Sequence, residues 1–85
     1  MLSSKNARVL ETIFALPVRS SIRWSDIETL FRALGAEVRE GVGSRVMVVL
    51  NDKVAVFHRP HPRPETDKGA VVAVRKFLTD AGIEP

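Results

Sequence analysis

The chain of 85 residues is long enough for one folded domain but too short for a core that encloses a deep substrate cavity. It contains no cysteine, which excludes disulfides, thiolate metal sites and cysteine nucleophiles. No apolar run has the length of a membrane span, and the N-terminal segment lacks the apolar core of a signal peptide. We therefore expect one cytoplasmic domain, residues 1–85, that acts through its surface and not on membranes.

The formal net charge of +3 is concentrated in one part of the chain. Residues 39–64 contain five basic residues against Glu40 and Asp52, whereas the remainder contains eight residues of each sign. This window therefore carries the positive excess, which favours a polyanionic partner. A solvated basic face would show the same excess.

The first predicted helix spans about residues 4–15. Ser3 or Ser4 can cap it, and Pro17 stops it. Its apolar residues recur at three- and four-residue spacing, at Val9, Leu10, Ile13 and Phe14. We treat residues 1–16 as an N-terminal helical extension.

A second helix is predicted from Ser25 onward. Ser25 is a good N-cap, Glu28 stands where a capping-box partner would be, and Trp24 precedes the cap. Gly35 occupies the position of a left-handed C-cap, so this helix should end near Leu34. Its buried stripe is formed by Ile27, Leu30, Phe31 and Leu34.

Three strands should follow, the first over Ala36–Glu40 with Val38 buried. Asn51 and Asp52 separate two β-branched runs, which predicts a hairpin with a two-residue loop. In that register one face carries the pairs Leu50 with Lys53, Val48 with Ala55, and Val46 with Phe57. The other face carries Val49 with Val54, Met47 with Val56, and Arg45 with His58.

A proline-rich extended loop leads from the hairpin to the last helix. Pro60, Pro62 and Pro64 each disfavour helix in the preceding residue. Thr66 or Asp67 can cap the last helix, and Gly82 ends it. Its apolar stripe is Ala70, Val71, Val74, Phe77 and Leu78. This order of elements predicts an α+β fold, a three-stranded antiparallel sheet with helices packed on one face.

The residues best suited to chemistry are His58 and His61, at the end of the last strand. Histidine can act as general acid and base near neutral pH. Arg45, Arg59 and Arg63 flank them and could hold phosphate oxygens, a set that suits RNA cleavage through the 2′-hydroxyl. The alternative is that both histidines are polar loop residues that fix the proline-rich turn.

Other site types have weaker support. The two histidines lack a third ligand nearby except Glu65 and Asp67, so we expect no metal, and nothing indicates a cofactor. Ser44 has no partner that marks it as a nucleophile, and a turn serine is the favoured interpretation.

Met47, Val49, Val54 and Val56 make the second sheet face apolar, although the helices cover only the first. Either that face is a partner surface or the predicted register is wrong.

Four segments, taken in order, resemble the HicA toxins of bacterial type II toxin–antitoxin systems. They are WSDIETLFRALGAEV, then GVGSR with a following strand, then FHRPHP, and finally DKGAVVAVRKFLTDAGI. The resemblance covers residues 24–83, the expected core, and the order of the segments makes it specific. It implies a fold like the double-stranded-RNA-binding domain, to which the N-terminal helix is an addition.

The resemblance also implies ribosome-independent mRNA cleavage and neutralisation by a HicB-like antitoxin that covers the active face. Many members have a histidine, taken to be catalytic, after the glycine–serine pair, whereas Arg45 follows Gly43 and Ser44 here. Our hypothesis is that His58, opposite Arg45, supplies an imidazole to nearly the same point in space.

The preferred interpretation is therefore an endoribonuclease toxin, a monomer when free, with His58 as general base or acid and His61 as second acid or orienting residue. The expected phosphate-binding residues are Arg45, Arg59, Arg63 and Ser44. The expected antitoxin-binding residues are Met47, Val49, Val54 and Val56. A catalytically silent RNA-binding module and a protein-interaction domain of the same fold are the alternatives.

Overall fold

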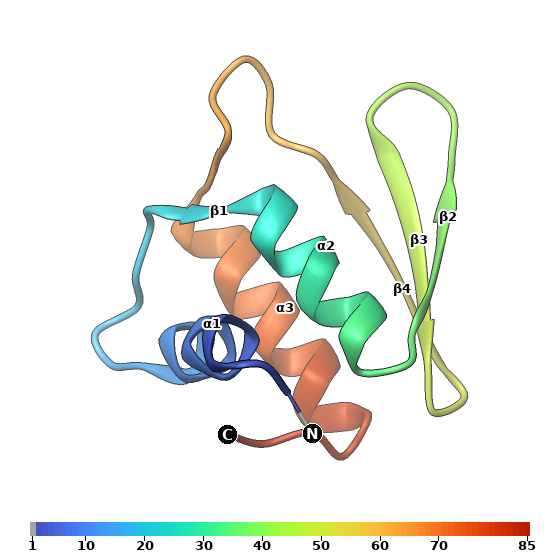
Figure 1. The fold of residues 1–85 in the computed structure, drawn as a ribbon. Coiled ribbons are helices and arrows are strands. Elements are labelled where there is room, and N and C mark those ends of the chain that lie inside the picture. The colour runs from blue at the N-terminus through green and yellow to red at the C-terminus, as the bar shows by residue number, and fades with distance from the viewer. Residues whose placement is uncertain (1) are drawn as a thin grey trace.

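The computed structural model describes residues 2–85, and Figure 1 shows how its elements are arranged. The helices are α1 (Ser4–Phe14), α2 (Trp24–Ala33) and α3 (Lys68–Asp80). The strands are β1 (Ile22–Arg23), β2 (Glu37–Glu40), β3 (Arg45–Leu50), β4 (Lys53–His58) and β5 (Glu65–Thr66). Strands β2, β3 and β4 form an antiparallel sheet in that order, so the predicted α+β fold is confirmed.

The β3–β4 hairpin forms at the predicted turn and in the predicted register. Asn51 and Asp52 have φ values of 50° and 67°, the left-handed values that a two-residue hairpin turn of type I′ requires. Arg45 stands opposite His58, and Met47 stands opposite Val56. The Asn51 side-chain amide also donates to the carbonyl oxygen of Ala81 at 2.9 Å, which ties the turn to the end of α3.

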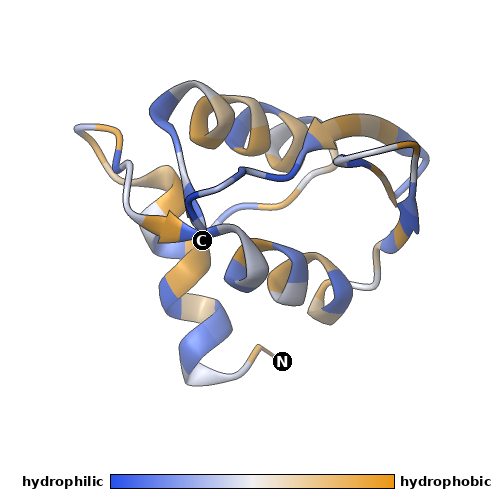
Figure 2. Cartoon of the chain, turned by 90° about the horizontal axis from the view of Figure 1, so that it is seen from above, coloured by the Kyte–Doolittle hydropathy of each residue, from blue (hydrophilic) through white to orange (hydrophobic). Residues whose placement is uncertain are grey.

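One face of the sheet is buried under α2 and α3. Along β3, Val46, Val48 and Leu50 are buried, while Met47 and Val49 on the other face are half-buried. Figure 2 shows apolar and polar segments alternating along the helices, the pattern of elements with one buried side. The helix residues that complete this core include Ile27, Leu30, Phe31, Val71, Val74 and Leu78.

Four aromatic side chains join α2, β4 and α3 within this core. Phe57 on β4 has its ring centroid 5.6 Å from that of Trp24 and 5.8 Å from those of Phe31 and Phe77. Aromatic pairs at these separations add stability beyond their buried area. Phe57 therefore holds the C-terminal end of β4 against both helices.

The first helix packs on α2 and α3, which lie between it and the sheet in Figure 1. The Ser3 hydroxyl accepts a hydrogen bond from the Asn6 amide at 3.1 Å, so the predicted N-cap is confirmed. At the other end, the Arg75 guanidinium of α3 donates to the carbonyl oxygens of Ile13 and Ala15, each at 3.0 Å. These bonds satisfy carbonyls that the helix end would leave free.

The predicted start of α2 is wrong by two residues, since the N-cap was expected at Ser25, and the predicted capping does not form. The helix begins at Trp24, and its N-cap residue Arg23 provides no side-chain cap. The capping box of Ser25 and Glu28 does not form, because the Glu28 carboxylate turns inward and accepts a hydrogen bond from the buried indole of Trp24. The predicted end is confirmed, since Gly35 follows with φ of 92°. Strand β2 begins one residue later than predicted.

A second, two-stranded sheet was not predicted. Strand β1 pairs antiparallel with β5, and the Trp24 amide donates to the Pro64 carbonyl at 3.0 Å. Two-residue strands are too short for alternation to be visible in a sequence. The pair fixes the far end of the proline-rich loop, next to the N-terminus of α3, where Asp67 accepts from the Ala70 amide at 2.8 Å as predicted.

Candidate functional site

The predicted pair of Arg45 and His58 lies where β3 begins and β4 ends, with both side chains exposed. The Arg59 amide donates to the Ser44 carbonyl at 2.9 Å, which makes Ser44 and Arg59 a hydrogen-bonded pair of the ladder. Because the two pair types alternate, Arg45 and His58 form a non-hydrogen-bonded pair, the type in which Cα atoms are about 4.5 Å apart and side chains lie closest. The sheet itself therefore brings a guanidinium and an imidazole together.

The loop between β2 and β3 fixes the position of Arg45. The Gly41 amide donates to the Arg45 carbonyl at 2.9 Å, and a Cβ atom added at Gly41 would lie only 3.0 Å from the Arg45 Cβ. Any larger residue at Gly41 would thus push Arg45 away. Gly43 has φ of 65°, a conformation that other residues rarely adopt.

His61, Arg63 and Ser44 are also exposed, the first two in the proline-rich loop and Ser44 in the turn just before β3. The structure joins Ser44 to the end of β4 through the Arg59 amide. It shows no hydrogen bond between His61 and His58. Among residues 2–85, neither Arg45 nor Arg63 forms an ion pair, so both guanidinium groups are free to contact a ligand.

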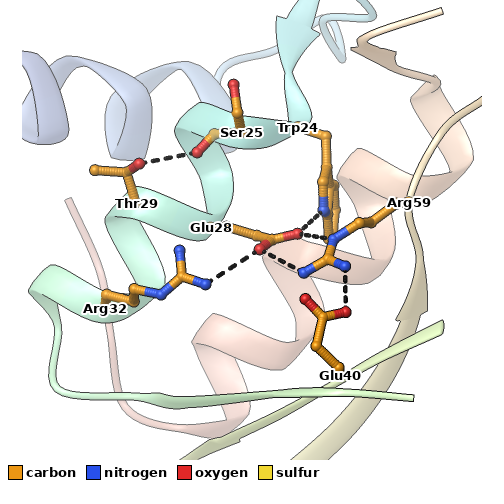
Figure 3. A network of polar contacts seen from close by, with 7 residues as sticks. All are labelled: Trp24, Ser25, Glu28, Thr29, Arg32, Glu40 and Arg59. Carbon is orange, nitrogen blue, oxygen red and sulfur yellow. Dashed lines mark hydrogen bonds and ion pairs between the residues drawn. The ribbon is translucent and has the colours of Figure 1, made fainter. Parts of the chain in front are cut away.

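Arg59, unlike Arg45 and Arg63, is held in a network of carboxylates, which Figure 3 shows. Its guanidinium donates to both oxygens of Glu28, from Nε at 2.6 Å and from Nη2 at 3.0 Å. Its Nη1 donates to Glu40 at 2.5 Å. The same Glu28 carboxylate accepts from Trp24 Nε1 and, at 3.4 Å, from Arg32. This Glu28 cluster, formed by Trp24, Glu28, Arg32, Glu40 and Arg59, connects α2, β2 and the residue after β4.

The charges of the Glu28 cluster stabilise one another. Burial raises the pKa of Glu28, but the hydrogen bonds from Arg59 and Trp24 and the nearby positive charges outweigh it, so the pKa lies below its ordinary value. The hydrogen bond from Arg59 also lowers the pKa of Glu40. Bonds to these two carboxylates raise the pKa of Arg59. All three groups are therefore held in their charged forms.

Sequence reasoning missed the role of Glu28. The signal was present in the helical spacing, because Glu28 follows Trp24 by four residues and precedes Phe31 by three, on the face that packs inward. A buried carboxylate needs a cationic partner, and Arg59 supplies it. The assignment of Glu28 to a capping box concealed this requirement.

The face of the sheet that no helix of residues 2–85 covers, here called the open face, is apolar at its centre. Val54 and Val56 are 60% and 54% exposed, and Met47 and Val49 are half-buried beside them. On β2 the residues on this face are Glu37, opposite Val49, and Arg39, opposite Met47. Glu37 and Arg39 form an ion pair at 2.7 Å. Arg45 and His58 lie at one end of this face.

No three histidine, aspartate or glutamate side chains of residues 2–85 gather as metal ligands would. Within the same range, no helix has both the length and the apolar character to span a membrane.

Residues 24–83 match the family model described as the HicA toxin of bacterial toxin–antitoxin systems, which is more than half of the chain. The chain belongs to the HicA toxin family. As a HicA toxin it is one component of a toxin–antitoxin system, and the family implies an antitoxin partner. Comparisons with curated proteins and with solved structures gave no match.

The HicA match begins at Trp24 and includes the hairpin, the proline-rich loop and every residue of the Glu28 cluster. Helix α1 and strand β1 lie outside it. The N-terminal helix is therefore an addition to the HicA core, attached through its apolar face and the Arg75 bonds.

Proposed function

We propose that this HicA-family protein is an endoribonuclease toxin that cleaves mRNA through the 2′-hydroxyl, as the family resemblance implies. The observation that carries the proposal is the cross-strand pair of Arg45 and His58, exposed at one end of the sheet. An imidazole and a guanidinium this close can act on the same phosphodiester. His61 and Arg63 lie in the loop that leaves the strand at this point.

In the proposed reaction one imidazole, for which we choose His58, accepts the proton of the 2′-hydroxyl. The 2′-oxygen bonds to phosphorus, the bond from phosphorus to the 5′-oxygen breaks, and an acid donates a proton to that oxygen. His61 is the candidate acid. The products are a 2′,3′-cyclic phosphate and a 5′-hydroxyl end, and Arg45 stabilises the charge that develops on the phosphate oxygens.

Arg59 takes a supporting role in this proposal. Its guanidinium is shared between Glu28 and Glu40, which supports a positioning role better than the phosphate contact predicted from sequence. It holds the residue after His58 to α2, and so fixes the direction in which β4 ends. The proposed phosphate ligands are then Arg45 and Arg63, with Ser44, the residue before Arg45, as a third.

The proposed partner is a HicB-like antitoxin that docks on the open face, in the cytoplasm where mRNA is available. Met47, Val49, Val54 and Val56 would form the apolar centre of the contact, and the ion pair of Glu37 and Arg39 would lie at its polar rim. Because Arg45 and His58 share this face, docking would block them without a change of shape. We propose that the free toxin is a monomer.

The test is RNA cleavage by His58→Ala, measured with purified protein and a single-stranded RNA. Because His58 is exposed, the fold should survive, and loss of a general acid–base group should slow cleavage about 10²–10⁴-fold. A substrate with one 2′-deoxy sugar at the cleavage point should remain intact with the wild type. Undiminished cleavage by folded His58→Ala would remove His58 from the mechanism and favour His61.

One observation favours a second candidate, a catalytically silent RNA-binding module. As the family resemblance implies, many HicA toxins have a histidine after the glycine–serine pair, and Arg45 occupies that position here. The two candidates differ in one measurement, because a silent module would bind the RNA and release it uncut. Binding without any cyclic phosphate product would establish this second function.

A further inference from the structure

A pocket of about 370 Å³ lies between α1 and the start of α2, away from the open face. Three of its eight lining residues are basic and one is acidic, and Val9 and Ile22 contribute apolar surface. The polar residues that line it are Lys5, Arg8, Thr12, Ser21, Arg23 and Asp26. We call it the N-terminal pocket.

The N-terminal pocket lies in a segment with an excess of basic residues that the net charge of the whole chain does not reveal. Residues 1–23 contain four basic residues against Glu11 alone, an excess equal to that of residues 39–64. Residues 24–38 and 65–85 together contain four basic and seven acidic residues, and these offset it in the total. The N-terminal extension is therefore a second basic region of the molecule.

The geometry of α1 places this charge in the pocket. Lys5, Arg8 and Thr12 are spaced by three and four residues, so they lie on one face of the helix. Lys5 forms an ion pair at 3.3 Å with Asp26, the only acidic residue in the lining. Among residues 2–85, Arg8 and Arg23 pair with no carboxylate. The Thr12 hydroxyl donates to the Arg8 carbonyl oxygen at 2.8 Å, so two guanidinium groups and the Ser21 hydroxyl are left for a ligand, beside one neutralised acid.

The pocket also adjoins the N-terminus of α2, where Arg23 gives the first turn no side-chain acceptor. The Trp24 amide is already bonded to the Pro64 carbonyl oxygen, but an anion there would still meet the positive end of the helix dipole in addition to the arginines. This feature alone would not define a site, and it adds to the cationic lining.

A second hollow lies between the N-terminal pocket and the proline-rich loop. It is lined by Ser20, Ser21, Arg63, Glu65, Asp67 and Lys68, so it shares Ser21 with the N-terminal pocket and Arg63 with the proline-rich loop. An RNA strand that runs from His58 along that loop can therefore reach Arg63, pass Ser21 and arrive at Arg8 and Arg23.

We propose that the N-terminal pocket binds a backbone phosphate of the RNA strand outside the cleavage site, so that α1 lengthens the RNA footprint of the HicA core. The inference rests on the proposed function, because it takes the RNA substrate as the ligand. Phosphate is the recognised group, since guanidinium groups bind phosphate oxygens in a bidentate manner and the Ser21 hydroxyl can add a further hydrogen bond.

The test compares Arg8→Gln and Arg23→Gln with Arg19→Gln in the full chain. All three variants remove one exposed charge from the N-terminal segment, but Arg19 does not line the pocket. The ligand is a single-stranded RNA with 2′-O-methyl sugars, which cannot be cleaved through the 2′-hydroxyl. Affinity is measured by fluorescence anisotropy over a range of salt concentrations. Each pocket variant should lower the slope of log affinity against log salt by roughly 0.7, and Arg19→Gln should lower it less.

Equal slopes of log affinity against log salt for the three variants would overturn the inference. The proposed function would still stand in that case, provided that the protein binds the RNA. A second arm titrates inorganic phosphate into the wild type and follows the backbone amides of Ser21 and Asp26 by NMR. Shifts of these amides without any RNA binding would make the pocket a site for free phosphate, which contradicts both the RNA assignment and the proposed function. Absence of binding to RNA and to phosphate would remove the site altogether.

Discussion

Glu28 is the residue on which the arrangement of side chains around the proposed site depends. A charged group in a protein core costs free energy unless hydrogen bonds and opposite charges replace its water. Glu28 receives these from Trp24, Arg32 and Arg59, so its burial is compensated by side chains of α2 and of the residue after β4. Removing the charge would leave the Arg59 guanidinium, which is 30% exposed, without its main partner.

We expect Glu28→Gln to destabilise the fold by about 3 kcal/mol, the lower limit for breaking a buried ion pair, because Arg59 is partly exposed. In a domain of this size that loss lowers Tm by roughly 12–24 °C. Thermal unfolding followed by circular dichroism measures it. Glu40→Gln is the matched control, and it should lower Tm much less because the Glu40 side chain is 70% exposed.

The same variant should change the response to acid. The pKa of Glu28 is lower in the folded state than its ordinary value of 4.5, so its contribution to stability is complete above that pH and is lost as the pH falls through the folded value. The wild type should therefore lose stability below about pH 4.5, and Glu28→Gln should lose less over this range. Parallel pH profiles of Tm would show that Glu28 is not a stabilising charge.

At the scale of single elements, the β3–β4 hairpin determines which side chains are presented to the proposed partner. Its turn sets the register, and the register assigns alternate residues to the core and to the open face. An exposed apolar strip of this kind usually marks an interaction site. The helices cannot reach it, since they are all on the other side of the sheet.

We therefore expect Met47→Asp and Val56→Asp to weaken antitoxin binding strongly, because each would bury a carboxylate without a partner in the contact. Calorimetric titration with the antitoxin measures the affinity. Val72→Asp is the matched control, since Val72 is similarly exposed, at 47%, but lies on α3. Its affinity should remain close to that of the wild type.

Two results would count against docking on the open face. One is unchanged affinity of both variants. The other is a large fall in Tm of the free Met47→Asp protein, which would place Met47 in the core and not at a surface. A similar loss of affinity in Val72→Asp would indicate a non-specific effect of added negative charge.

The hairpin was predictable because the residues that determine its turn and register are close together in the sequence. Asn51 and Asp52 tolerate left-handed backbone, and the β-branched runs on either side leave one register that buries Val46 and Val48. The open face and the pairing of Arg45 with His58 follow from it. The start of α2 was not predictable in this way, because the partner of Glu28 is Arg59, 31 residues further along the chain. A local capping rule could not include that contact.

The candidate site likewise has features that follow from local sequence and features that depend on tertiary packing. Arg45 and His58 could be placed together from sequence, since cross-strand pairing follows from the turn. The separation of Arg59 from the free arginines could not, because it depends on where α2 packs against the sheet. The short strands β1 and β5 also depend on tertiary packing, and their two residues each carry too little pattern to indicate pairing.

For the whole molecule, α1 changes the charge distribution more than the fold. The core of residues 24–83 has its own sheet and two covering helices, and α1 adds apolar contacts on the outer side of α2 and α3. Its exposed side brings Lys5 and Arg8 next to Arg23. A count of residues 39–64 against the remainder missed the basic excess of residues 1–23, because the acidic residues of 24–38 and 65–85 cancel it in the sum.

The proline-rich loop also determines how the protein responds to trypsin. The loop is exposed, but Arg59 and Arg63 are each followed by proline, which trypsin does not cleave, and β5 holds the far end of the loop in a sheet. Arg19, in the exposed connection between α1 and β1, is followed by serine. Limited digestion of the native protein, followed by mass spectrometry, should therefore give a first cut after Arg19 that separates α1 from the HicA core. The loop that carries His61 should remain intact until the core unfolds.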